Sequence, residues 1–312
     1  MSKDPTMCGI AALQLRNPSL HPQMGSLLSS MLCQIVDRGP DSAGLAVYNT
    51  PGLVSPGTST LSLLGKDQGM TTADITAGVA ALLAGALPAG AAAAVQVVGD
   101  TTLVSAAVGT DLLVKAVSET LPGATIIGRG EHVAVMKSVG HPMEIAAEHG
   151  LEAMAGSQGL SHTRMATESA VTAGGSHPFS VADDLCLVHN GSFSNHATVR
   201  RELRREGVVF DSENDTEVGA RYVASRLKQG DTLEEALVNL GKVLDGFYTL
   251  VVTTADSMAV VRDPIACKPA IIAETDDYVA MASEYRALAG LPGISNALIF
   301  EPEPGKVYTW SL

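Results

Sequence analysis

The sequence predicts an α+β protein in which helical layers cover β-sheets, with a small α+β lobe inserted in its first half. Of the 312 residues, 46% are hydrophobic and 17% are charged, a balance typical of a globular chain with a sizeable core. The second half repeats apolar strand-like runs flanked by amphipathic helices, which indicates sheets covered by helical layers. Residues 51–157 hold helices and strands of their own behind a loop rich in Pro, Gly, Ser and Thr. We therefore interpret about 51–157 as an insertion.

A strand, a helix and a second strand are predicted before the insertion. The apolar run 10–15 predicts a strand directly after Cys8. Residues 24–36 place apolar side chains at the i, i+3 and i+4 spacing of one helix face. Residues 45–48 are again strand-like. These elements bring Cys8 to the start of a buried strand.

The inserted lobe is predicted to contain two helices and four strands. Its helices are expected over the Ala-rich run 73–87 and the amphipathic run 111–120. Its strands are expected over 95–98, 103–107, 124–127 and 132–136, the last two as a hairpin across Gly128-Arg129-Gly130. The lobe holds no recognisable catalytic grouping. Its uncharged stretch is rich in Ala and Gly and interrupted by Pro88, which argues against a membrane span.

The second half alternates strands with helices. Strands are expected over 185–189, 247–253, 259–262, 270–273 and 278–282. Helices are expected over 197–206, 217–228 and 232–244. Thr232 and Glu235 have the spacing of a capping box at the start of the last helix.

Charge and cysteine content exclude several classes of function. The net charge is −13 and no Lys/Arg stripe stands out, which argues against nucleic-acid binding. The four cysteines form no CxxC pair and show no zinc-ligand spacing, so neither a metal site nor a disulfide framework is expected. The first residues carry no apolar run typical of a signal peptide. These features favour a cytoplasmic protein.

Cys8 combines two catalytic groups if residues 1–7 are removed. Its thiol is an intrinsically strong nucleophile, and its own α-amino group would have a pKa of about 7.7–8, well suited to moving a proton near neutral pH. The alternative is a buried, inert structural cysteine. The remaining motifs of the chain favour the catalytic interpretation.

Three further positions could complete an amide-cleaving site. Asn190-Gly191 follows an apolar strand, and an amide NH₂ with a glycine N–H can stabilise an oxyanion; the alternative is an ordinary Asn-Gly turn. Arg164 could grip a carboxylate, or it could be a surface arginine. Asp215 precedes a predicted helix and could bind an ammonium group or cap that helix.

Taken together, these motifs resemble the class II glutamine amidotransferases, the N-terminal-cysteine branch of the Ntn hydrolases. The resemblance runs from Cys8 to the C-terminus, the insertion excepted, and the motifs keep the family's order. The site motifs are Cys8-Gly9-Ile10, Arg38-Gly39-Pro40-Asp41-Ser42-Ala43-Gly44, His162-Thr163-Arg164-Met165-Ala166-Thr167, His189-Asn190-Gly191 and Asn214-Asp215-Thr216-Glu217. The frame motifs are His177-Pro178-Phe179, Asp245-Gly246-Phe247-Tyr248, Arg262-Asp263-Pro264 and Ala282-Ser283-Glu284.

The resemblance implies a four-layer αββα sandwich and a set of catalytic roles. Cys8 would be the nucleophile, with its α-amine as the base once the leader 1–7 is gone. Asn190 and Gly191 would stabilise the oxyanion, and Arg38 would shape the site around the cysteine. The expected reaction is hydrolysis of glutamine to glutamate and ammonia through a γ-glutamyl thioester on Cys8.

The resemblance also implies how glutamine is bound. Arg164 would hold the α-carboxylate with Thr167 nearby, Asp215 would hold the α-ammonium, and Gly191 would contribute to the substrate site. Met165 and Ala166 replace a more usual aromatic and small polar pair, which implies a pocket that differs in detail from the family's. The two charged clamps would select free glutamine, because a peptide-bound glutamine would leave them unpaired.

Family members couple this chemistry to an ammonia-consuming partner. The chain carries no nucleotide, flavin or cluster motif, so it is expected to bind no cofactor and to act as a separate amidotransferase subunit. The partner would be a glutamate-synthase-like subunit, such as that of N-methylglutamate synthase, which could carry FMN and iron–sulfur clusters. Two alternatives remain open: another N-terminal-cysteine amide hydrolase, or an inactive regulatory subunit in which Cys8 stays blocked.

Overall fold

The centre of the protein is a pair of antiparallel sheets packed face to face. The computed structural model describes residues 8–165 and 172–312. The first sheet has the strand order β15 (Leu298–Phe300), β13 (Ile271–Glu274), β14 (Tyr278–Ala282), β1 (Gly9–Leu15), β8 (Gln158–Arg164), β2 (Ser42–Tyr48) and β7 (Val133–Val139). The second has the order β16 (Val307–Ser311), β12 (Ser257–Arg262), β11 (Gly246–Thr253), β10 (Leu185–Phe193) and β9 (Phe179–Ala182).

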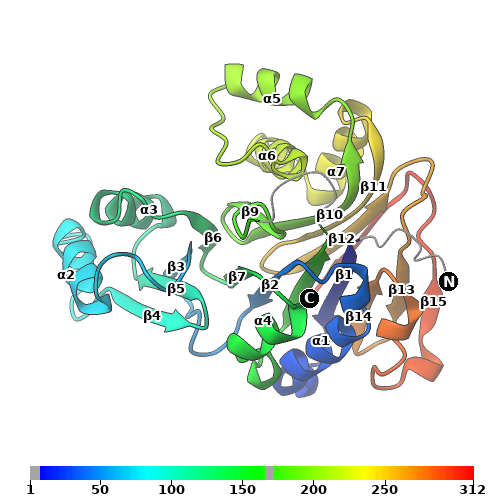
Figure 1. Ribbon diagram of the computed structural model, residues 1–312, viewed down its shortest axis with the longest axis horizontal. Helices are drawn as coiled ribbons and strands as arrows, with labels where there is room; N and C mark the ends of the chain where they lie inside the picture. The colour runs from blue at the N-terminus through cyan, green and yellow to red at the C-terminus, as the bar shows by residue number, and fades with distance from the viewer. Residues whose placement is uncertain (1–7, 166–171) are drawn as a thin grey trace.

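Helices cover the outer face of each sheet (Figure 1). The first sheet is covered by α1 (Met24–Cys33) and α4 (Pro142–Glu148), and the second by α5 (His196–Arg205), α6 (Asp215–Lys228) and α7 (Leu233–Val243). Thr232 and Glu235 form the predicted capping box of α7. The layers follow the order helix, sheet, sheet, helix. The α+β class and the four-layer arrangement are thus confirmed.

Strand β1 explains how the layers are held together. All of its residues are buried, because each of its faces packs against a different layer. Ile10 and Ala12 point into the core between the sheets, whereas Leu13 and Leu15 pack beneath the helices. The strand therefore reads as an apolar run interrupted only by Gln14, and the residue before it, Cys8, stands at the end of a central strand of the sheet.

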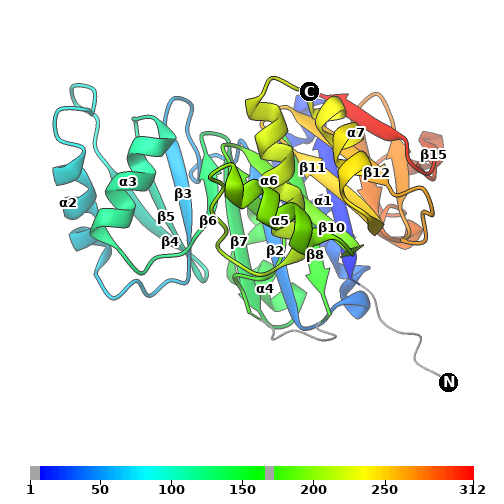
Figure 2. The same ribbon diagram turned by 90° about the horizontal axis from the view of Figure 1, so that it is seen from above.

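The inserted lobe forms a separate sheet beside the main body (Figures 1 and 2). Its strand order is β4 (Ala94–Val98), β5 (Thr101–Ala106), β3 (Ser59–Leu64) and β6 (Ile126–Gly130). Two helices, α2 (Thr72–Leu82) and α3 (Thr110–Thr120), share its apolar core. The independent sheet accounts for residues 59–130 of the expected insertion 51–157. The rest of that segment includes β7, which pairs with β2, and α4, which packs on α1.

The predicted hairpin between the last two strands of the lobe is wrong. Strand β6 pairs with β3 in the lobe sheet, whereas β7 pairs with β2 in the main body. The backbone of both strands is instead tied to Asp184: its carboxylate accepts the His132 N–H at 2.7 Å, and its own N–H donates to the Arg129 carbonyl at 2.9 Å. The chain therefore passes from one sheet to the other at residues 131–132.

Gly44 of β2 lies directly beneath the carbonyl group of His177. A Cβ atom at position 44 would stand 1.9 Å from that carbonyl oxygen. We expect Gly44→Ala to lower the free energy of unfolding by about 3 kcal/mol, because backbone must move to admit the methyl group. Gly123→Ala is the matched control, since a Cβ there meets nothing within 4 Å. Equal urea-unfolding midpoints for the two variants would contradict this close approach.

Candidate functional site

A cavity of about 1150 Å³ lies between the strand ends of the two main sheets, helix α6 and the lobe. Its wall includes Cys8 at the start of β1, Arg164 at the end of β8, Asn190 and Gly191 on β10, and Asp215 at the start of α6. These residues are far apart in the sequence, and the fold gathers them along one cavity. The lobe also contributes to the wall, through Leu64, Thr125 and Ile126, which the sequence does not predict.

The backbone around Cys8 is fixed by buried side chains on both sides of β1. The Gly9 N–H donates to Thr163 Oγ1 at 3.1 Å, on neighbouring strand β8. The Ile10 N–H donates to Ser283 Oγ at 2.9 Å, just beyond β14 on the opposite side. Both hydroxyl groups replace partners that a strand end would otherwise lack. Thr163 and Ser283 both belong to the sequence motifs, but no role was predicted for either.

Arg38 and Asn190 both contact the Cys8 carbonyl oxygen. Arg38 donates to it from Nε at 3.1 Å, and Asn190 donates from Nδ2 at 2.9 Å. The guanidinium also donates from Nη1 to Glu284 at 2.8 Å, so its orientation is set by a carboxylate. Arg38 thus lies beside the cysteine, as expected from its motif.

Asn190 and Gly191 are placed by the pairing of β10 with β11. Gly191 has a φ of +145°, and a Cβ atom there would lie 2.0 Å from the Phe247 carbonyl oxygen, so only glycine fits. The Asn190 amide is buried, and its Nδ2 carries a second hydrogen besides the one donated to Cys8. Asn190 therefore stands next to Cys8, and Gly191 follows it in the cavity wall; both residues could donate to an oxyanion. The alternative of an ordinary Asn-Gly turn does not apply, because both residues lie within β10.

Asp215 lines the cavity, and the preceding residue, not Asp215, caps α6. Asn214 is the N-cap, and its side chain accepts the Thr216 N–H at 2.8 Å. The Asp215 carboxylate instead accepts the Phe193 N–H at 2.8 Å, which fixes it against β10. Its side chain keeps 22% of its surface exposed, toward the cavity where a ligand could reach it.

Arg164 lies in the cavity wall near the start of α6. It is partly buried, and its Nη1 donates to the Gly175 carbonyl at 3.3 Å. Asn214 Nδ2 donates to the same carbonyl at 3.1 Å, so the arginine and the start of α6 share a partner. Thr167 lies outside the described residues, as does Ala166.

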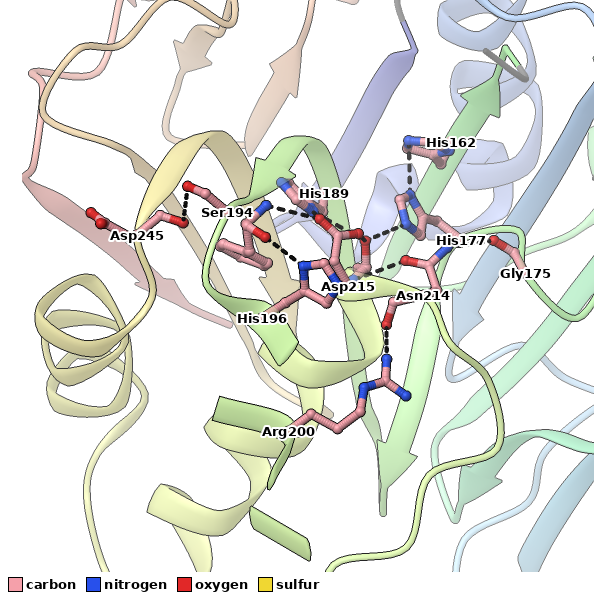
Figure 3. A network of polar contacts seen from close by, with 12 residues as sticks. His162, Gly175, His177, His189, Ser194, His196, Arg200, Asn214, Asp215 and Asp245 are labelled. Atoms are coloured by element: carbon pink, nitrogen blue, oxygen red, sulfur yellow. Dashed lines mark hydrogen bonds and ion pairs between the residues drawn. The ribbon is translucent and has the colours of Figure 1, made fainter. Parts of the chain in front are cut away.

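A chain of buried histidines leads to Thr216, the residue next to Asp215 (Figure 3). His162 Nε2 lies 2.9 Å from His177 Nδ1, and His177 Nε2 lies 2.8 Å from Thr216 Oγ1. His189 Nδ1 lies 3.0 Å from the same hydroxyl. The sequence motifs include all three histidines but do not reveal this chain, because the contacts join β8, β10 and α6. The network positions the first turn of α6 and hence Asp215.

All three histidines are neutral near pH 7. Burial lowers the pKa of His162 to about 3 and the pKa of His189 to about 4, although the nearby Asp215 carboxylate opposes the shift of His189. Burial also places the pKa of His177 well below its usual value. The 3.9 Å approach of His189 to Asp215 is therefore not an ion pair, and the histidines hold this region by hydrogen bonds.

These lowered pKa values predict a loss of stability in acid. Between pH 6.5, the usual pKa of histidine, and about pH 4, the two histidines bind a proton in the unfolded chain. In the folded protein, buried His162 and His189 stay neutral over this range. The free energy of unfolding should fall by about 1.4 kcal/mol per pH unit for each such histidine, and it is fully retained above that window. Urea unfolding of His162→Gln should show a shallower pH slope than the wild type. A pH slope for His162→Gln equal to that of the wild type would contradict the prediction.

The described residues contain neither a membrane-spanning helix nor a cluster of metal-binding side chains. In residues 8–165 and 172–312, no helix has the length and apolar content to cross a bilayer. The same ranges contain no cluster of three or more His, Cys, Asp or Glu side chains that could hold a metal ion.

Comparison with known proteins identifies the family. Residues 162–290 match the family model described as "Glutamine amidotransferase domain". The chain is 48% identical over 305 residues to glutamine amidotransferase-like protein GlxB of Rhizobium meliloti, covering 97% of this chain and 98% of that protein. An amidophosphoribosyltransferase of Archaeoglobus fulgidus is 30% identical over 186 residues, covering 59% of this chain and 40% of that enzyme.

Structural comparison gives the same fold. The glutamine phosphoribosylpyrophosphate amidotransferase of B. subtilis superposes with a TM-score of 0.60 at 18% identity, covering 97% of this chain and 47% of that chain. The fold is thus that of an Ntn-type amidotransferase domain. With its close relative aligned along nearly the whole length, the chain belongs to the class II glutamine amidotransferase family.

Proposed function

We propose that this chain hydrolyses L-glutamine to glutamate and ammonia with Cys8 as the nucleophile. The observation that carries the proposal is the cavity in which Cys8, Asn190, Gly191, Arg164 and Asp215 meet. A nucleophile, oxyanion donors and two opposite charges are the parts that cleavage of a free amino-acid amide requires. Family membership supports the same reaction.

The proposed reaction forms and then hydrolyses a thioester. The Cys8 thiol gives its proton to the α-amine and attacks the side-chain amide carbon of glutamine. The resulting oxyanion would be stabilised by Asn190 Nδ2 and the Gly191 N–H. The amine returns the proton to the leaving nitrogen, which departs as ammonia. Water then attacks the γ-glutamyl thioester, which releases glutamate and restores the thiol.

Glutamine would be oriented by charges at its other end. The Arg164 guanidinium would bind the α-carboxylate, and the Asp215 carboxylate would bind the α-ammonium. Asp215 suits this role because a backbone N–H fixes it while part of its surface stays open to the cavity. A glutamine within a peptide would present neither charge and would forgo both charge-assisted contacts, at a cost of several kcal/mol.

The experiment that tests this mechanism is the mass of the active chain. We expect protein from its native host to begin at Cys8, because a peptide-bound nitrogen cannot act as the base. Intact-mass analysis should be combined with an assay of glutamate release from the same sample. The matched sample is a chain in which residues 1–7 cannot be removed, which should be inactive. Full activity with residues 1–7 attached would overturn the mechanism.

We infer further that the ammonia passes to a partner subunit. The family resemblance suggests a glutamate-synthase-like partner, which would itself carry FMN or iron–sulfur clusters. Partner and acceptor substrate should then favour the glutamine-binding state, a coupling of about 1–3 kcal/mol. Glutaminase turnover should be measured with and without proteins that co-purify from the host. Turnover that no co-purified protein alters would argue for a plain glutaminase.

A further inference from the structure

Lys137 is a buried lysine in the cavity wall, remote from Cys8. It lies on β7, and the strand register aligns it with Gly44 of β2, His162 of β8 and Ile10 of β1. Three strand spacings separate it from β1, a distance of about 14 Å. The free glutamine expected at Cys8 is a small ligand, whereas the cavity of about 1150 Å³ exceeds the usual volume for drug-sized molecules. The cavity thus has room for a second compartment around Lys137.

The ammonium group of Lys137 has no counter-ion among the described residues. The residue is only 2% exposed, and its Nζ lies 4.8 Å above the centre of the Phe179 ring. It forms no hydrogen bond or ion pair with another residue of 8–165 or 172–312. Burial lowers its pKa to about 8, so the group is still mostly charged at neutral pH. A buried cation without an anion is costly, and such groups are usually paired.

The neighbouring acidic groups do not supply that anion. The Glu217 carboxylate is engaged elsewhere: it accepts the N–H groups of Asp211 and Ser212 at 2.9 and 2.7 Å and pairs with Arg221 at 3.1 Å. Cys186 is a neutral thiol, because burial raises its pKa to about 11. Glu217 attracts Lys137 only from a distance, and no acidic group of the described residues contacts the ammonium, which leaves that contact to a ligand.

A second polar group lines this compartment. The Ser180 hydroxyl is buried in the cavity wall beside the Cys186 sulfur and makes no hydrogen bond with an oxygen or nitrogen atom of the described chain. Part of the surrounding wall is apolar. It is formed by Leu64, Ile126, Ile127, Phe179 and Val181, of which Leu64 and Ile126 come from the lobe.

We propose that Lys137 and Ser180 bind the carboxylate of a small aliphatic acid whose hydrocarbon part lies against the lobe. One ammonium and one hydroxyl suit a singly charged carboxylate, whereas a doubly charged phosphate would need more donors. The apolar wall of Leu64, Ile126 and Ile127 would bury the hydrocarbon chain. This subsite is separate from the glutamine clamps, and it gives the lobe a role in ligand recognition. The proposal does not rest on the glutamine chemistry.

The test is binding of hexanoate to the full chain, measured by calorimetry without glutamine. Hexanoate should bind at millimolar concentration, whereas hexan-1-ol and hexylamine, which lack the anion, should not. Lys137→Met should weaken hexanoate binding at least about tenfold, because it removes a charge-assisted contact. Lys268→Met is the matched control: Lys268 also lines the cavity over an aromatic ring, that of Phe247, and its loss should leave hexanoate binding unchanged.

Three outcomes would overturn the proposal. They are equal binding by the wild type and Lys137→Met, no binding by the wild type at millimolar concentration, and binding lost in Arg164→Met but kept in Lys137→Met. The last would place the carboxylate in the glutamine clamp. Melting temperatures show whether a loss of binding is caused by unfolding. Lys137→Met removes an unpaired buried charge, so this variant should melt no lower than the wild type. Ser180→Ala is a second variant, expected to weaken binding about threefold.

Discussion

Alanine at Cys8 should abolish glutamine hydrolysis and leave the fold intact. The contacts that fix this residue come from its carbonyl oxygen, which accepts from Arg38 and Asn190, so the thiol is free for chemistry. Cys8→Ser should be nearly as inactive, because a hydroxyl is a much weaker nucleophile at neutral pH. Glutamate release measures the first effect, and the free energy of unfolding in urea measures the second.

Cys33 provides the matched control for this experiment. It is an exposed cysteine at the end of α1, so Cys33→Ala should keep both activity and stability. Substantial glutamate release by Cys8→Ala would refute the nucleophile assignment. A large loss of stability in that variant would show instead that the thiol serves packing.

Removing the charge of Asp215 should lower kcat/KM for glutamine by about 30- to 1000-fold. That range corresponds to about 2–4 kcal/mol for one charge-assisted contact with the substrate ammonium. Asp215→Asn is the sharper variant, because its amide oxygen can still accept the Phe193 N–H that fixes the side chain. The loss should therefore reflect the missing charge rather than a misplaced residue.

Glu213 offers a control two residues away. Its carboxylate also lines the cavity but is 86% exposed and pairs at the surface with Arg200 and Arg204. We expect Glu213→Gln to change kcat/KM by less than about threefold. Similar losses in the two variants would indicate a general effect of cavity charge, and the specific ammonium clamp would then be wrong.

Regular apolar patterns allowed most of the fold to be predicted. The helices α1, α5, α6 and α7 begin and end within a few residues of their predicted bounds, because each presents one periodic apolar face to a sheet. Strand β8 was not predicted, although it lies in the middle of the first sheet. Its polar side chains find buried partners in the neighbouring strands, as Gln158 does with Gln14. Composition alone does not reveal such pairing.

The site could be predicted only as far as its motifs reach. Cys8, Asn190 and Asp215 were proposed from short motifs, and the fold brings them to one cavity. The histidine chain and Lys137 were not foreseen, since their roles depend on contacts between distant strands. For Lys137 a signal was present in the sequence: it is the single charge within the mainly apolar strand β7. A charge buried in a strand often marks a functional site.

The anchoring of Cys8 has a consequence for the timing of catalysis. Hydroxyl groups on either side of β1 accept the N–H groups of the two residues that follow Cys8. Two further side chains donate to the Cys8 carbonyl oxygen. The entropy of fixing this backbone is therefore lost when the protein folds, and under the proposed function glutamine would meet a nucleophile whose position is already set. Cleavage of the leader would then act as a chemical switch, creating the base at a site that folding has already assembled.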